Sequence, residues 1–117
     1  MFNQGIEVNI VPGGAPAIVH AAKGDNGRDV TCRLLEGDHA AAVDNTMSAS
    51  VEGVKPSGAT FTASATIHPS NMEPYISFAV TSAMTAEAGK AACRIKITKG
   101  NDIVSTGKFI LDVEDIN

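Results

Sequence analysis

The chain has 117 residues, with 13 acidic and 9 basic side chains and a formal net charge of −4. That length suits one domain around a single core, so we expect residues 1–117 to form one β-domain. The charge and the lack of a basic run exclude a nucleic-acid footprint, and no apolar run approaches the roughly 20 residues of a membrane helix.

Alternation of apolar and polar residues predicts strands in the first half of the chain. We expect them over 6–11, 17–20 and 29–35 and from 47 to near the turn at 55–58, with stops at Pro12-Gly13-Gly14 and at the turns 23–27 and 36–39. Gly24 and Gly27 suit positive φ in the first of these turns, where Asp25 suits side-chain capping. Residues 40–45 are ambiguous, because three Ala favour a helical turn whereas Val43-Asp44 suits a strand.

The second half begins with a strand over 59–67, which a break at 68–71 ends. Strands over 75–80 and 90–99 follow, and residues 81–89 have the composition of one or two helical turns that end at Gly89. A turn at 99–102 leads into a strand over 103–113, which closes a β-hairpin. About seven strands with regular turn signals predict an immunoglobulin-like antiparallel β-sandwich with one short helical turn.

Cys32 and Cys93 are the two cysteines, and each has inward parity in its predicted strand. In an immunoglobulin-like layout these are the second and sixth strands, where a disulfide between the sheets can form. The alternative is two buried thiols, because the start of the chain lacks the features of a signal peptide and predicts a soluble, unexported protein. Two isolated cysteines do not complete a metal site.

Residues with catalytic or ligand chemistry do not cluster in the sequence. The three histidines, His20, His39 and His68, fall in separate loops or strand ends, and His39 beside Asp38 is the best pair. A loose acidic group (Asp25, Asp29, Asp38, Asp44) lacks the spacing of a calcium loop. No nucleophile or phosphate-binding motif is present, so we expect no enzymatic activity, no metal and no cofactor.

An interaction surface is the remaining candidate site. We expect Thr60, Thr62, Ser64 and Thr66 to line the outer face of their strand, where they form either a docking surface or a solvated face. A carbohydrate-binding module is an alternative, but it would rely on exposed aromatic residues, and Tyr75 is the sole Tyr in a chain without Trp. A bacterial adhesin-type module is another, and oxidised cysteines would favour it.

Several segments share their order and spacing with one known family. They run from about residue 6 to 114 and comprise Lys23-Gly24-Asp25-Asn26-Gly27-Arg28 before the strand 30–35, Gly53-Val54-Lys55-Pro56-Ser57-Gly58, Met84-Thr85-Ala86-Glu87-Ala88-Gly89 before Ala92-Cys93-Arg94-Ile95-Lys96-Ile97, and Ile103-Val104-Ser105-Thr106-Gly107-Lys108-Phe109. Together they resemble the N-terminal domain of the phage baseplate upper protein family, which begins tail-fibre, baseplate and head-fibre proteins of phages of Gram-positive bacteria.

The resemblance implies a virion structural protein that is assembled in the cytoplasm of the bacterial host. In the family this domain anchors its protein to the particle, and downstream segments form a shaft that presents receptor-binding proteins. The implied partners are other virion proteins of the baseplate, tail or capsid, and the full-length protein is expected to form a homo-oligomer, a trimer when its shaft is present. The family has no catalytic residues to carry over.

Overall fold

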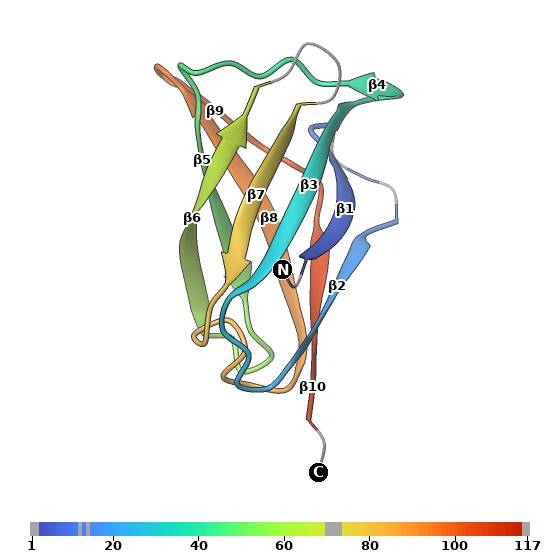
Figure 1. Ribbon diagram of the computed structural model, residues 1–117, viewed down its shortest axis with the longest axis vertical. Helices are drawn as coiled ribbons and strands as arrows, with labels where there is room; N and C mark the ends of the chain where they lie inside the picture. Colours follow the sequence, from blue (N-terminus) through green and yellow to red (C-terminus); the bar gives the residue numbers. More distant parts are fainter. Residues whose placement is uncertain (1–2, 12, 14, 70–73, 116–117) are drawn as a thin grey trace.

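The structure is a computed structural model that describes residues 3–11, 13, 15–69 and 74–115, and within these it has ten strands and no helix. The strands are β1 (Asn3–Asn9), β2 (Ala17–Ala22), β3 (Arg28–Glu36), β4 (His39–Ala40), β5 (Ser48–Val54), β6 (Thr60–His68), β7 (Tyr75–Val80), β8 (Gly89–Lys99), β9 (Asp102–Ser105) and β10 (Phe109–Glu114) (Figure 1). The predicted all-β fold is confirmed, with more strands than the seven expected. The described residues contain no helix of the length and apolar character that crossing a bilayer requires.

The strands form two packed sheets that share β6. Sheet A has the order β1-β3-β7-β6, with β4 beside β3, and sheet B has the order β6-β5-β8-β10-β2, with β9 beside β8. Residues 60–65 of β6 pair with β5, whereas residues 66–68 pair with β7. One strand therefore passes from one sheet to the other, and Figure 1 shows the two layers on either side of the core.

Two strand pairs run parallel, which corrects the prediction of an antiparallel sandwich. β1 runs parallel to β3, with Ile6 opposite Cys32, and β2 runs parallel to β10, with Val19 opposite Leu111. The other pairs are antiparallel. Alternation of side chains shows which face of a strand is buried, but it does not specify the direction of a partner that is distant in sequence.

The side chain of Gln4 bridges β1 and β2, the terminal strands of the two sheets. Its amide nitrogen donates a hydrogen bond to the backbone carbonyl of His20, and its amide oxygen accepts one from the backbone N–H of His20 at 2.9 Å. Strand edges expose backbone groups that need partners. Gln4 supplies these partners and nearly closes the sandwich along this side.

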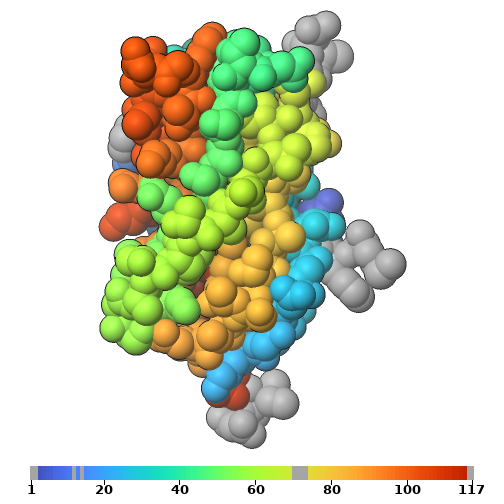
Figure 2. Space-filling view, turned by 90° about the vertical axis from the view of Figure 1, so that its left-hand side faces the viewer, coloured from blue at the N-terminus to red at the C-terminus, as the bar shows by residue number. Residues whose placement is uncertain are grey.

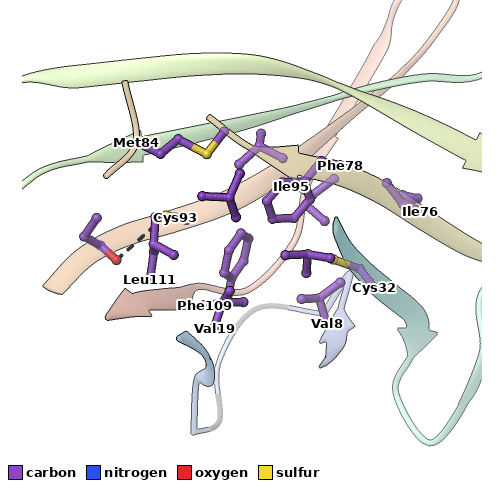
Figure 3. Close-up of a cluster of buried hydrophobic side chains, with 14 of the residues drawn as sticks. Val8, Val19, Cys32, Ile76, Phe78, Met84, Cys93, Ile95, Phe109 and Leu111 are labelled. Atoms are coloured by element: carbon purple, nitrogen blue, oxygen red, sulfur yellow. Dashed lines mark hydrogen bonds between the residues drawn. The ribbon is translucent and has the colours of Figure 1, made fainter. Parts of the chain in front are cut away.

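Alternate side chains of both sheets fill one core. The buried set includes Val8, Val19, Val30, Cys32, Leu34, Val51, Ile76, Phe78, Val80, Cys93, Ile95, Phe109, Leu111 and Val113. Phe78 of sheet A and Phe109 of sheet B meet with their ring centroids 5.8 Å apart (Figure 3). Because each large apolar side chain contributes about 1.5–3 kcal/mol when it is fully buried, this core is the main source of stability.

A β-bulge separates β9 from β10. Ser105 lies opposite Lys96, but β10 resumes with Phe109 opposite Cys93, so the register shifts by one residue across 106–108. Thr106 fills the interruption, because its hydroxyl oxygen accepts a hydrogen bond from the N–H of Ile95 at 3.1 Å and its own N–H donates to the carbonyl of Ile95 at 2.9 Å. The prediction of one continuous strand over 103–113 is therefore wrong, since a contact with another strand interrupts it.

The helical turns predicted over 81–89 are absent as a helix. Residues 82–85 instead form a turn, in which the N–H groups of Met84 and Thr85 donate to the carbonyl of Thr81 at 3.0 and 3.3 Å. Met84 and Thr85 are both buried, and the Thr85 hydroxyl donates to the carbonyl of Asp25 at 2.7 Å. The segment thus plugs one end of the sandwich and needs no helix to do so.

The ambiguous segment 40–45 contributes only the end of the two-residue strand β4, and residues 41–44 have no regular structure. The turn at 23–27 follows the prediction. Gly24 and Gly27 have φ values of 93° and 103°, and the Asp25 carboxylate accepts a hydrogen bond from the N–H of Ala22 at 2.8 Å. The predicted stop at 12–14 and the break at 68–71 lie partly outside the described residues.

Candidate interaction surface

The outward face of β6 carries a row of hydroxyl side chains. Thr60, Thr62, Ser64 and Thr66 are all exposed, whereas Phe61 on the opposite face is buried. In Figure 2 the yellow-green atoms of β6 cross the face turned toward the viewer. The exposure that alternation predicts for these four residues is confirmed. Their role in binding stays a prediction.

Strand register extends this face across sheet B. One row contains Thr62, Glu52 and Arg94 on β6, β5 and β8. The adjacent row crosses five strands and consists of Thr60, Val54, Ala92, Ile110 and Ile18. Residues directly opposite each other on paired strands share one face of the sheet. A mainly apolar row therefore lies beside a row that carries charge.

Two hollows that share Arg94 and Lys108 lie on this outer face. The first has a volume of about 540 Å³, and Val54 and Thr62 are among the residues that line it. The second has a volume of about 580 Å³, and its lining includes Ile110. These volumes fall in the range of ligand pockets in proteins. The face is thus recessed where the apolar and charged rows meet.

The shared border of the hollows is positively charged. Arg94 Nε lies 3.7 Å from a carboxylate oxygen of Glu52, and both side chains are solvent-accessible. Exposed pairs of this kind contribute little to stability. Lys108 is exposed, and it forms no ion pair with any of the described residues. A protein of net charge −4 therefore presents two cations at a recessed site.

The predicted catalytic and ligand candidates do not converge. His39 Nδ1 lies 3.2 Å from Asp38 Oδ1, but both side chains are exposed, whereas His68 Nε2 contacts the Ser77 hydroxyl at 2.8 Å in another part of the fold. No group of three or more His, Cys, Asp or Glu residues suitable for a metal ion occurs within 3–11, 13, 15–69 and 74–115. The structure therefore assembles no site from these residues.

Two acidic residues of the predicted loose group, Asp25 and Asp44, have local partners instead. The pKa of Asp44 falls to about 2 because its carboxylate accepts hydrogen bonds from Thr46 and contacts Lys99. A hydrogen bond from the N–H of Ala22 and a contact with Arg28 likewise lower the pKa of Asp25. These carboxylates stabilise turns and strand ends, which is the role that loop chemistry favours for them.

The two cysteines enter the core from opposite sheets. Cys32 on β3 and Cys93 on β8 are buried free thiols, and in Figure 3 they lie on opposite sides of the Phe109 side chain. Burial raises the pKa of each thiol to about 12, which disfavours the reactive thiolate. The inward orientation that parity predicts is confirmed, and a disulfide between the two residues stays a prediction for the oxidised protein.

Tyr75, on which a carbohydrate-binding role would depend, stacks on His68. The two ring centroids are 4.3 Å apart and the interplanar angle is 14°. One face of the Tyr75 ring is therefore covered, which leaves only the other face for a sugar ring to stack on.

Sequence reasoning identified the hydroxyl row of β6 but missed the cationic border. Arg94 has outward parity in β8, which was the available signal, whereas Lys108 lies next to the bulge that the sequence did not reveal. Val54 was not singled out, although the predicted strand extends to near the turn at 55–58.

A solved structure of the N-terminal domain of phage TP901-1 ORF48 is similar to this chain. The TM-score is 0.71 at 10% sequence identity, and the alignment covers 97% of this chain and 99% of that chain. At this identity the similarity shows a shared fold. No protein-family model matches the sequence, and no curated protein matches it.

Proposed function

We propose that this chain is a structural, non-enzymatic component of a phage virion. The observation that carries the proposal is the fold, which extends over 97% of the chain and is shared with the N-terminal domain of a phage protein. The sequence segments that resemble the phage baseplate upper protein family support the same assignment independently of the coordinates. In this role the sandwich anchors a baseplate, tail-fibre or head-fibre protein to the particle and supports the presentation of receptor-binding proteins.

The outer face of sheet B is the docking surface in this proposal. It combines the hydroxyl row of β6 with two adjoining hollows, and the exposed side chain of Val54 is 46% accessible. Apolar surface beside polar groups suits protein–protein contact. β10 runs toward one end of the long axis (Figure 1), so a shaft that follows it would extend from that end and leave the outer face of sheet B accessible. Trimer formation belongs to the shaft.

Incorporation into particles tests the docking surface. Thr62→Glu adds a carboxylate at an exposed position, and we expect the fold to survive while the amount of the chain in purified particles falls at least several-fold. Ala79→Glu is the matched control, because residue 79 is exposed on β7 of the opposite sheet. Equal incorporation of both variants and the original chain would show that this face of β6 does not take part in docking.

A further inference from the structure

We infer that the two hollows of sheet B bind an extended, acidic segment of a partner protein, which places alternating apolar and carboxylate side chains on them. The inference rests on the proposed function only for the identity of that partner as another virion protein. The chemistry of the segment comes from the hollows themselves, as the following contacts indicate.

The border between the hollows selects negative charge. Arg94 and Lys108 line both hollows, and Glu52 is the single carboxylate in either lining. The 3.7 Å between Arg94 Nε and the Glu52 carboxylate is longer than a hydrogen bond. The guanidinium can therefore still donate hydrogen bonds to a second carboxylate that lies closer. Lys108 brings an exposed ammonium with no ion pair among the described residues. A carboxylate that bridges these cations forms charge-assisted hydrogen bonds, which are stronger than neutral ones.

The remainder of the lining selects apolar side chains. Val54 and Ala92 line the first hollow, and Pro16 and Ile110 line the second. The neighbouring Ile18, opposite Ile110, is 48% exposed. The apolar row is adjacent to the charged row in strand register, so one bound segment can contact both.

An extended segment satisfies both requirements. Side chains two positions apart in a strand point to the same side and are separated by about 6.6 Å along the chain, so apolar and acidic residues at every second position of a short segment reach both hollows. The linings have one carboxylate against two cations, so charge complementarity favours an occupant that carries carboxylates. We therefore assign the hollows to an acidic and apolar strand of another protein, and self-association is an outcome of the test.

Lys108→Glu separates this docking role from folding. Lys108 is exposed outside the regular strands, so reversal of its charge should leave the fold intact. The matched control is Lys90→Glu, which makes the same charge change at an exposed position on β8, four residues from Arg94 and outside both hollows.

The experiment is a titration of the isotope-labelled chain with a capped seven-residue peptide, Ser-Val-Ser-Glu-Ser-Val-Ser, in which Val and Glu alternate at every second position, followed by two-dimensional NMR. We expect saturable amide shifts at residues lining both hollows, binding about tenfold weaker for Lys108→Glu and within twofold of the original for Lys90→Glu, and weaker binding in added salt. Three results would each overturn the inference: no saturation up to about 10 mM peptide, shifts elsewhere on the surface, or equal binding of a Val and Lys peptide.

Three further outcomes identify whether the inference or the proposed function has failed. If the peptide-free chain doubles its mass with concentration in light scattering, and the same amides shift, the hollows bind a second copy and the inference is wrong. If the peptide binds as expected but the chain is absent from purified particles, the proposed function is wrong and the binding site stands. If the chain is present in particles and Lys108→Glu is incorporated normally, the proposed function stands and the hollows are not the docking site.

Discussion

Replacement of Gly53 by Ala should destabilise the sandwich, because Phe61 occupies the space that a side chain at position 53 needs. The two residues lie opposite each other on β5 and β6. A Cβ added to Gly53 would lie 2.2 Å from Cζ and 2.6 Å from Cε2 of Phe61. Carbon atoms in contact prefer about 3.5–4.0 Å, so the ring must move by more than ~1 Å. Phe61 is only 8% exposed, and its movement disturbs the packing of the core.

Two opposing effects set the magnitude. Overpacking of a core usually costs about 1–3 kcal/mol. The exchange of Gly for Ala in a strand returns up to about 1 kcal/mol, because the unfolded chain of the Ala variant has less conformational entropy to lose. We therefore expect a net decrease of about 1–2 kcal/mol in the free energy of unfolding, and a lower melting temperature by about 4 °C or more.

Urea unfolding followed by circular dichroism measures this change, and the urea dependence should keep its slope. Gly5→Ala is the control, because a Cβ on Gly5 of β1 meets no atom within 4 Å, and its effect should be neutral or slightly stabilising. In a Phe61→Leu background the cost of Gly53→Ala should disappear. The steric reasoning is refuted if Gly53→Ala is as stable as the original chain, or if its cost is the same with Leu at position 61.

Two other predictions concern buried polar and titratable groups. Thr106→Val removes the hydroxyl that accepts a hydrogen bond from the Ile95 N–H. The buried N–H is then unsatisfied, so the free energy of unfolding measured in urea should fall by about 1–3 kcal/mol, whereas Thr106→Ser should keep most of the stability. Equal losses for both variants would refute the role of the hydroxyl. Burial raises the pKa of Cys32 and Cys93 to about 12, so each thiol keeps its proton in the folded state to higher pH than in the unfolded state. Their stabilising contribution is full below about pH 9 and should fall by up to about 1.4 kcal/mol per pH unit per thiol up to about pH 12. Cys93→Ala should reduce the dependence of the unfolding free energy on pH in this range, and alkylation should modify the two thiols only after unfolding. Rapid alkylation of the native chain would contradict their burial. The absence of two titratable thiols after unfolding would indicate the disulfide.

Strands that depend on local alternation were predictable from the sequence. The strand 75–80 was predicted with the bounds that β7 has, and the expected strand 59–67 differs from β6 by one residue at each end. In β6 apolar and polar residues alternate without interruption, and in β7 the large apolar residues Ile76, Phe78 and Val80 occupy every second position, so burial of one face determines the conformation. The same alternation correctly placed the hydroxyl row of β6 on the outside.

Features that depend on distant partners were not predictable in this way. The bulge before β10 requires Thr106 to bond with Ile95 on another strand, and the parallel direction of β2 depends on its pairing with β10. Neither contact leaves a local pattern. The cationic border of the hollows is a further example, because Lys108 joins Arg94 only once the bulge has shifted the register.

A cryo-electron-microscopy map of the purified particles tests the central claim most directly. The account predicts that the sandwich occupies a fixed position in the virion, and that the outer face of sheet B, including the two hollows, contacts a neighbouring virion protein. A map in which every ordered protein is identified and none has this fold would contradict the claim that the chain is a structural part of the particle.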